Sequence, residues 1–391
     1  MSGETALART PSLFVDTTRM ALLSGVTGIP RVITQLGTAL ATMEAPGSLQ
    51  VKFSEFGPDG FLYQRGLPTL GGSHAKRRRV ERKRINLRPS DVVLFPDVIS
   101  VPHGPRDSEV TMLREQGVRV FFIGYDLLPK THPQYFRPYS RLIYDRWFEA
   151  AVRADGIIFI SGAAEREFTR FMADARGAES FSPRTGHTGL ACEVPVFAQR
   201  AATGRNSLQN RKSFAFLMVG TLEPRKGHQA VLEAFERLWE KGRRHTLTIV
   251  GRPGWLTEKL QKRIREHPQL GLRLFFLDKA DDEQLWREYI TADALIANSE
   301  AEGYGLPLIE AAAVGLPILA RKIEPFVEIA GDHAFYLDSG DADSVVDSII
   351  EWCSLASAGT NPDSRAIHVN NWTTVAEEVL EFLGRHDSGA R

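Results

Sequence analysis

Residues 214–251 read FAFLMVGTLEPRKGHQAVLEAFERLWEKGRRHTLTIVG, and this stretch decides the fold. A short apolar run, 214–220, is followed by an amphipathic pattern over 228–242 and then by a second apolar run, 245–251. Short continuous apolar runs are typical of strands that are buried on both faces of a parallel sheet. The stretch therefore predicts a strand, a helix and a second strand parallel to the first.

The same alternation continues along the chain in both directions. Beyond residue 251, amphipathic segments at 257–267, 282–292 and 307–315 alternate with apolar runs at 272–278, 293–299 and 316–320. Residues 13–161 contain a similar but weaker series. We therefore expect an α/β protein with two Rossmann-like domains whose parallel sheets face each other across a cleft.

The expected domain boundaries follow from where the pattern weakens. Residues 1–195 form the N-terminal domain, 196–212 a polar linker, and 213–391 the C-terminal domain. The last helix of the chain is expected to pack back on the N-terminal domain.

Composition limits the class of protein. The chain has 391 residues, 43% of them hydrophobic and 25% charged, as in soluble globular proteins. Two cysteines, Cys192 and Cys353, are too few for a disulfide framework. The beginning of the sequence lacks the features of a signal peptide, and no apolar run is long enough to span a membrane. These features favour a cytoplasmic protein.

Two cations follow the first strand of the C-terminal domain. Arg225 and Lys226 lie in the loop before the helix that starts near His228. Arginine can bind a phosphate through two parallel hydrogen bonds, and lysine adds a point charge. The alternative interpretation is a solvated pair in an ordinary loop. Because ligands bind at the carboxyl ends of parallel strands, this position favours a ligand-binding role.

Two glutamates flank a glycine-containing turn in EGYGLPLIE, residues 302–310. Glu302 lies in the loop after a predicted strand, and Glu310 lies about one turn into the next helix. Acidic residues at this place could simply stabilise the helix dipole. However, Gly303 and Gly305 would let the backbone approach a ligand, and a helix N-terminus binds phosphate readily.

Taken together, these groups fit a nucleotide-diphosphate sugar. Arg225, Lys226 and the helix N-terminus would hold the diphosphate. Glu310 would accept hydrogen bonds from the ribose hydroxyls, and Glu302 from the sugar. Protein cations would then stabilise the charge of the leaving group, so we expect neither a metal ion nor a cofactor.

The sequence EGYGLPLIEAAAVGLPIL resembles the Glu-x7-Glu signature of family 4 retaining glycosyltransferases, which have the GT-B fold. GTLEPRKGH is similar to their phosphate-binding loop, and the resemblance is strong over about residues 213–330. It implies the same roles for the two cations and two glutamates, with Glu302, Arg225 and Lys226 taking part in catalysis. It further implies donor contacts from Thr221, Gly303, Tyr304, Gly305 and Leu306. Many members have Arg where this chain has Thr221.

The N-terminal half resembles the acceptor side of the same family. TGIPR, residues 27–31, is similar to the first-strand loop that faces the diphosphate, and it adds Gly28 to the donor-binding residues. YDLLPKTHPQYF, starting at Tyr125, resembles segments of polysaccharide-building members, many of which have His at that position. We expect a catalytic role for Asp126 and an acceptor-side role for Tyr125 and His132. For His132 a purely structural role is the alternative.

Residues 76–84 form a basic run of seven cations and one glutamate. We expect this run to dock on anionic lipid, helped by the upstream aromatic residues Phe53, Phe56, Phe61 and Tyr63. A solvated loop is the alternative. No nucleic-acid-binding motif accompanies the charge, so nucleic acid is not an expected partner.

The resemblance implies a hexosyltransferase that acts in cell-surface polysaccharide synthesis. It would retain the anomeric configuration and act on a glycan or lipid-linked glycan, at the inner face of the membrane. GDP-mannose is the first candidate donor. A sugar-nucleotide epimerase and a non-catalytic nucleotide-sugar-binding scaffold remain as alternatives. A glycosidase would not need the two cations, and a dehydrogenase would carry Gly-x-Gly-x-x-Gly after its first strand.

Overall fold

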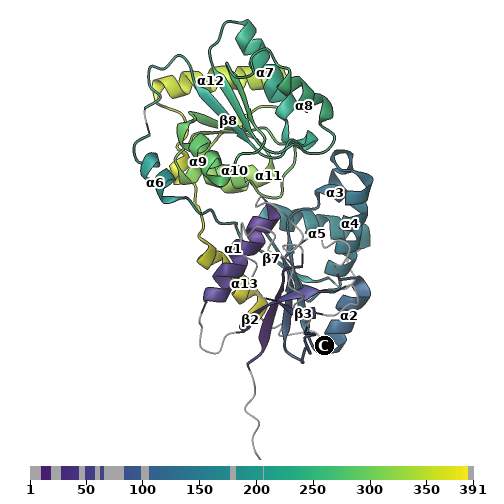
Figure 1. Cartoon of the computed structure of the whole chain (residues 1–391). Helices are drawn as coiled ribbons and strands as arrows, with labels where there is room; N and C mark the ends of the chain where they lie inside the picture. The colour runs from purple at the N-terminus through teal and green to yellow at the C-terminus, as the bar shows by residue number, and fades with distance from the viewer. Residues whose placement is uncertain are drawn as a thin grey trace, which may run out of the picture. The chain divides into compact units, whose positions relative to one another are not determined.

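The computed structural model describes residues 10–18, 28–43, 49–57, 62–65, 83–97, 105–176, 182–205 and 207–385 (Figure 1). The chain divides into two compact units. Unit 1 comprises Met1–Asp126, Pro138–Leu190 and Trp372–Arg391, and unit 2 comprises Leu127–Arg137 and Ala191–Asn371.

Unit 1 is built on a sheet that, within the described residues, has the strand order β3-β2-β1-β4-β5-β6-β7. The antiparallel pair in this sheet is β2 with β3, and the other pairings are parallel. The strands are β1 (Ser12–Asp16), β2 (Gln50–Phe56), β3 (Leu62–Arg65), β4 (Val92–Phe95), β5 (Arg119–Gly124), β6 (Gly156–Phe159) and β7 (Arg184–His187). The central strands β1 and β4 are buried along their whole length, as strands covered on both faces must be.

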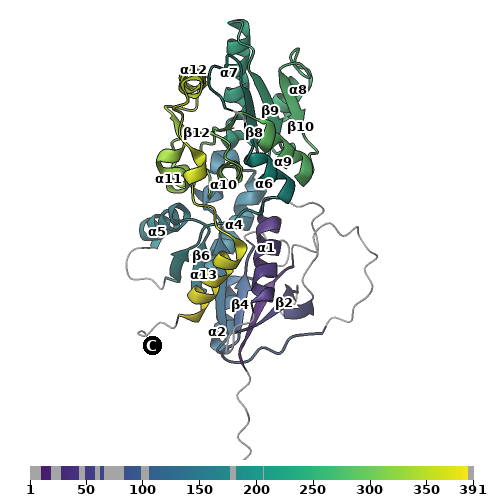
Figure 2. The ribbon, with the colours of Figure 1, turned by 90° about the vertical axis from the view of Figure 1, so that its left-hand side faces the viewer.

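The helices of unit 1 include one from the far end of the chain. They are α1 (Ile29–Thr42), α2 (Asp107–Glu115), α4 (Pro138–Ala151), α5 (Gly162–Arg176) and α13 (Trp372–Gly384). The last helix, α13, packs beside α1 (Figure 2). The guanidinium of Arg184 lies 4.4 Å from the ring centroid of Phe382 and donates hydrogen bonds to carbonyl oxygens at the end of α13. Thus α13 is part of unit 1.

Two interpretations of the N-terminal half were incomplete or wrong. The series of apolar runs over residues 13–161 stops one strand short, because β7 follows it and pairs with β6. The sequence of β7 is RTGH, which has no apolar run, since an edge strand needs none. Phe53 and Phe56 are only 9% and 2% exposed and so cannot sit at a lipid interface. Phe61 and residues 76–82 lie outside the described residues.

Unit 2 is built on a parallel sheet with the order β10-β9-β8-β11-β12-β13 among its described residues. The strands are β8 (Ala215–Val219), β9 (Thr246–Val250), β10 (Leu274–Leu277), β11 (Ala294–Ala297), β12 (Ile318–Arg321) and β13 (Phe335–Leu337). The helices are α3 (Leu128–Thr131), α6 (Val196–Ala202), α7 (His228–Glu240), α8 (Glu258–Arg265), α9 (Asp282–Thr291), α10 (Leu306–Ala313), α11 (Glu324–Ala330) and α12 (Ala342–Ala358).

Alternating side chains of β8 show how both faces of this sheet are covered. Phe216 points into a core with α7 and α12, where its ring centroid lies 5.5 Å from that of Phe235 and 5.4 Å from that of Trp352. Leu217 points into the opposite core, which α9 and α10 complete. Figure 1 shows α7 and α12 on one side of β8, and α9 and α10 on the other.

The predicted linker 196–212 is not a free connection, because its first part is helix α6. Ala198 of this helix is buried in the same core as Trp286 of α9. Arg205 then donates hydrogen bonds of 2.7 Å to the carbonyl oxygens of Tyr289 and Ala292. The sequence did not predict this helix, because the stretch is mostly polar and the helix buries only one small residue, Ala198. In this part of the chain, the division between the units falls between Leu190 and Ala191.

The strand order places a topological switch point in unit 2. The chain passes from β8 outward to β9 and β10, and then returns to β11 on the other side of β8. From the carboxyl ends of the adjacent strands β8 and β11, the chain goes on to helices on opposite faces of the sheet, α7 and α10. Open α/β sheets bind ligands at such a point. Among the described helices, none is long and apolar enough to cross a membrane.

Candidate functional site

The loops after β8 and β11 touch through their backbones. The amide of Glu300 donates a hydrogen bond of 2.7 Å to the carbonyl oxygen of Arg225. Gly227 has φ of 74°, and a Cβ atom there would lie 2.3 Å from the carbonyl oxygen of Asn298. Only glycine fits this position, because it combines a left-handed conformation with a contact too close for any side chain.

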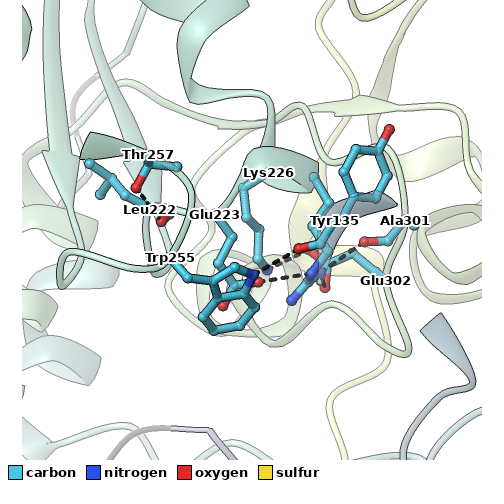
Figure 3. Close-up of polar contacts among 9 residues, drawn as sticks. Tyr135, Leu222, Glu223, Lys226, Trp255, Thr257, Ala301 and Glu302 are labelled. Carbon is cyan, nitrogen blue, oxygen red and sulfur yellow. Dashed lines mark hydrogen bonds and ion pairs between the residues drawn. The ribbon is translucent and has the colours of Figure 1, made fainter. Parts of the chain in front are cut away.

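The loop after β9 packs against the loop after β8. A Cβ atom at Gly251 would lie 1.8 Å from the carbonyl oxygen of Gly220, and one at Gly254 would lie 2.2 Å from that of Leu222. The hydroxyl of Thr257 donates to the Leu222 carbonyl at 3.0 Å (Figure 3). Three loops are thus locked together at the ends of adjacent strands.

This frame holds a buried charge cluster, which we define as Glu223, Arg225, Lys226 and Glu302. Figure 3 labels Glu223, Lys226 and Glu302. Arg225 Nη1 lies 2.8 Å from Glu302 Oε2, and Arg225 Nε lies 2.9 Å from Glu223 Oε2. Lys226 Nζ bonds the other oxygen of Glu302. The four side chains are between 9% and 14% exposed, so the cations are not a solvated pair.

The electrostatics of the two carboxylates differ. Burial alone would raise the pKa of Glu302, but Arg225, Lys226 and a hydrogen bond from Ser299 lower it to about 2. Burial raises the pKa of Glu223, and the neighbouring cations only partly oppose this effect. Glu302 is therefore firmly ionised, whereas Glu223 is held less strongly in its charged form.

His228 is the first residue of α7 and is only 1% exposed. Neither of its ring nitrogens has a hydrogen-bond partner in the described part of the chain. Burial, together with the charges of Lys226 and Arg225, lowers its pKa to about 3. The imidazole is thus neutral. Neither Glu223 nor His228 was among the residues predicted from the sequence, where they look like ordinary loop and helix-start residues.

Glu310 is hydrogen-bonded to a residue outside the charge cluster. Since α10 begins at Leu306, Glu310 is in the second turn of that helix. Its side chain is buried and accepts a hydrogen bond of 2.7 Å from the hydroxyl of Tyr289. The loop from Glu302 to α10 consists of the predicted donor residues Gly303, Tyr304 and Gly305, and Leu306, also predicted, begins the helix. Thr221, another predicted donor residue, lies in the loop after β8, directly before Leu222.

The short segment Leu127–Arg137 belongs to unit 2 and contacts the charged loops. Trp255 Nε1 donates a hydrogen bond of 2.7 Å to the carbonyl oxygen of Tyr135 (Figure 3). The hydroxyl of Tyr135 bonds the carboxylate of Glu300. Tyr135, Trp255 and Glu300 could not be predicted from the sequence as part of the site, because nothing local connects positions so far apart.

The acceptor-side candidates are placed as follows. Tyr125 is buried in unit 1, and its hydroxyl donates to the carbonyl oxygen of Pro96 at 2.9 Å. Asp126 accepts hydrogen bonds from the hydroxyl of Tyr144. His132 contacts the Thr131 hydroxyl through Nδ1 at 2.9 Å and stacks on Tyr135, contacts that suit its structural alternative.

Gly28, the remaining predicted donor residue, directly precedes α1 with φ of 63°. This left-handed conformation explains glycine at that position without reference to a ligand. Thr27 lies outside the described residues.

Comparison with known families identifies the domain that carries the charge cluster. Residues 199–368 match the family described as glycosyl transferases group 1. The chain carries a group 1 glycosyltransferase domain. This domain contains β8, β11 and the two loops that leave them, so the charge cluster lies wholly inside it.

Individual relatives agree with this assignment. The chain is 32% identical over 382 residues to the serotype-specific mannosyltransferase WbdA of Escherichia coli, covering 96% of this chain and 45% of the relative. The chain therefore spans about half the length of the curated relatives it matches.

Solved structures show the GT-B fold. The structure of Anabaena Alr3699/HepE in complex with UDP and glucose aligns with a TM-score of 0.60 at 15% identity, covering 97% of this chain and all of that chain. The catalytic domain of starch synthase IV from Arabidopsis thaliana aligns with a TM-score of 0.59 at 14% identity, covering 95% of this chain and 98% of that one. At these identities the likeness shows the fold alone.

Proposed function

We propose that this chain transfers a hexose from a nucleotide-diphosphate sugar to a glycan or lipid-linked glycan, with retention of the anomeric configuration. The buried charge cluster at the switch point of a group 1 glycosyltransferase domain carries the proposal. The name of the relative WbdA supports mannose as the sugar, and GDP-mannose is the first candidate donor. Cell-surface polysaccharide synthesis is the proposed setting.

In this proposal the two cations bind the diphosphate. Glu302 holds Arg225 and Lys226 in place through its two oxygens, and it lies in the loop that would approach the donor sugar. Cations fixed before the substrate arrives need no reorganisation when charge develops on the leaving group. Departure of the diphosphate would then proceed without a metal ion. The departing oxygen would help to remove the proton from the incoming hydroxyl on the same face of the sugar.

Glu310 is proposed to accept hydrogen bonds from the ribose. Its link to the Tyr289 hydroxyl supports this role, because a hydrogen bond fixes the orientation of the carboxylate. Asp126 is proposed to serve the acceptor side, and residues 76–84 an anionic membrane surface. The first proposal rests on the family resemblance, and the second rests on the seven cations of the basic run.

A transfer assay with a lipid-linked acceptor tests the proposal. We expect transfer of mannose from GDP-mannose, and NMR of the product should show an α linkage from the α-linked donor. Arg225→Ala combined with Lys226→Ala should abolish transfer. Lys262→Ala, which removes a cation that is 74% exposed on α8, is the matched control and should leave transfer unchanged.

The alternatives give different results in the same assay. Conversion of the donor sugar without an acceptor would indicate an epimerase. Nucleotide-sugar binding with no turnover, tested with several donors and acceptors, would indicate a scaffold. Product of inverted configuration would contradict the retaining mechanism while leaving the donor site in place.

A further inference from the structure

The charge cluster is balanced before any ligand arrives. Two carboxylates, Glu223 and Glu302, face two cations, Arg225 and Lys226, in a place that is almost closed to water. Burying a charge without a partner is costly, whereas a balanced cluster avoids most of that cost.

A bound diphosphate would upset this balance. It adds negative charge next to cations that already serve two carboxylates, so each carboxylate loses part of its stabilisation and meets a new repulsion. Solvent hardly reaches this buried site and therefore does not screen the charge of the diphosphate. The response that costs the least free energy is protonation of one carboxylate, which makes it neutral.

The contacts indicate which carboxylate responds. Glu302 bonds both Arg225 and Lys226 and also receives a hydrogen bond from Ser299. Among the described residues, Glu223 forms one ion pair, to Arg225 Nε at 2.9 Å, and is only 9% exposed. Lys226 acts on Glu223 only through its nearby charge. Glu223 is therefore the carboxylate held by fewer contacts, and both of the cations that stabilise it would turn to the phosphate.

We propose that the Glu223 carboxyl takes up one proton from solvent when a diphosphate binds to Arg225 and Lys226. This inference rests on the proposed donor site and adds to it a residue that couples donor binding to pH. A proton taken up on binding favours the complex at lower pH. Above the pKa of Glu223 in the free protein, affinity should fall by up to about tenfold per pH unit, until the pKa in the complex is passed.

The other groups around Glu223 do not offer an equal site for the proton. Glu302 has its pKa lowered to about 2 by its cations. His228 at the start of α7 has its pKa lowered to about 3, mainly by burial, which the ligand would not reverse. The loop after β9 contributes the neutral side chains of Trp255 and Thr257, while its charged residue, Arg252, is exposed to solvent.

Isothermal titration calorimetry measures this proton directly. GDP-mannose or UDP-glucose, whichever binds, is titrated at one pH in two buffers of different ionisation enthalpy. Both phosphates of such a donor are fully ionised near neutral pH, so the ligand itself exchanges no proton. The difference in heat gives the number of protons taken up. We expect a value approaching one for the unaltered chain.

Variants assign the proton to its residue. Glu223→Gln should bind the donor with no proton uptake and with an affinity that no longer falls as pH rises. Glu223→Asp keeps an ionisable group and should retain uptake. His228→Asn tests the nearest competing group, and Glu283→Gln removes a carboxylate that is 63% exposed on α9. Both should retain uptake.

Each contrary outcome has a distinct meaning. Donor binding without proton uptake would overturn this inference and leave the proposed function intact. Uptake that persists in Glu223→Gln but disappears in His228→Asn would assign the proton to the imidazole and would also overturn it. Failure of every nucleotide sugar to bind the folded chain would overturn both the inference and the proposed function.

Discussion

At the scale of single residues, the state of Glu302 depends on its two cations. Its pKa is lowered to about 2, below the usual value for glutamate. A carboxyl with a lowered pKa in the folded state contributes stability that is present above its unfolded pKa and is lost as pH falls through its folded pKa. Glu302 should therefore stabilise unit 2 at neutral pH and stop doing so in strong acid.

Glu302→Gln tests this dependence. We expect the variant to lose about 3–5 kcal/mol of unfolding free energy at neutral pH, because two buried cations each lose an ion pair to Glu302. The difference from the unaltered chain should shrink as pH falls toward about 2, since the wild-type carboxyl then becomes neutral as well. Urea unfolding at several pH values measures it. A difference that stays constant with pH would contradict the assigned ion pairs. The exposed Glu283→Gln is the control.

The residues of the charge cluster differ in how well the sequence could predict them. Arg225, Lys226 and Glu302 stand out because they follow apolar runs that end at one edge of a sheet. Glu223 could not be predicted, because its significance comes from burial against Arg225, and loop residues near a turn are usually exposed. The contact of Tyr135 with Glu300 spans 165 positions and leaves no local signal.

At the scale of elements, the contact between the loops after β8 and β11 depends on Gly227. A side chain there would have to displace Asn298 or the loop itself. Gly242 offers a close comparison, because its φ is 75° but nothing lies within 4 Å of where its Cβ atom would be. The two glycines share backbone conformation and differ in the space around them.

We expect Gly242→Ala to cost about 1 kcal/mol of unfolding free energy, the penalty of a left-handed residue. Gly227→Ala should cost clearly more and should also weaken nucleotide binding, since it moves the loop that holds Arg225. Thermal unfolding and a nucleotide titration of both variants measure the difference. Equal losses, with nucleotide affinity intact in both, would show that the loop contact does not shape the site.

The elements that could be predicted are those with strong apolar patterns. β8 and β11 lie at the centre of their sheet and are covered on both faces, so all of their residues are apolar. β7 at the sheet edge and the small helix α6 bury too little to produce such a pattern. Their positions follow from tertiary packing, which a single sequence does not display.

At the scale of the whole molecule, the chain crosses between two units and returns. Helix α13 comes last in the sequence and yet completes the core of unit 1, where Phe382 packs edge-on against Phe121 at a centroid distance of 6.0 Å. Unit 2, by contrast, contains the entire charge cluster. Stability of unit 1 and donor binding by unit 2 should therefore respond to different substitutions.

Phe382→Ala separates the two properties. We expect it to destabilise unit 1 by about 3–5 kcal/mol, the usual cost of removing a buried ring, and to leave nucleotide affinity unchanged. Calorimetric unfolding with and without nucleotide measures both effects. Leu142→Ala, at a position in α4 that is 66% exposed, is the control. Loss of nucleotide affinity in folded Phe382→Ala protein would argue against a donor site confined to unit 2.

The central claim is that the charge cluster of unit 2 binds the diphosphate of a nucleotide. A thermal-shift panel with GDP, UDP, dTDP and ADP tests it most directly. At a ligand concentration of 100 times Kd, binding stabilises the folded state by about 2.7 kcal/mol, which raises Tm by several degrees in a protein of this size.

We expect at least one of these nucleotides to raise Tm in the unaltered chain and in Lys262→Ala. The same nucleotide should have no effect in the folded double variant Arg225→Ala, Lys226→Ala, and a reduced effect in Glu310→Gln. A shift of equal size in the double variant, or no shift with any of the four nucleotides, would contradict the account.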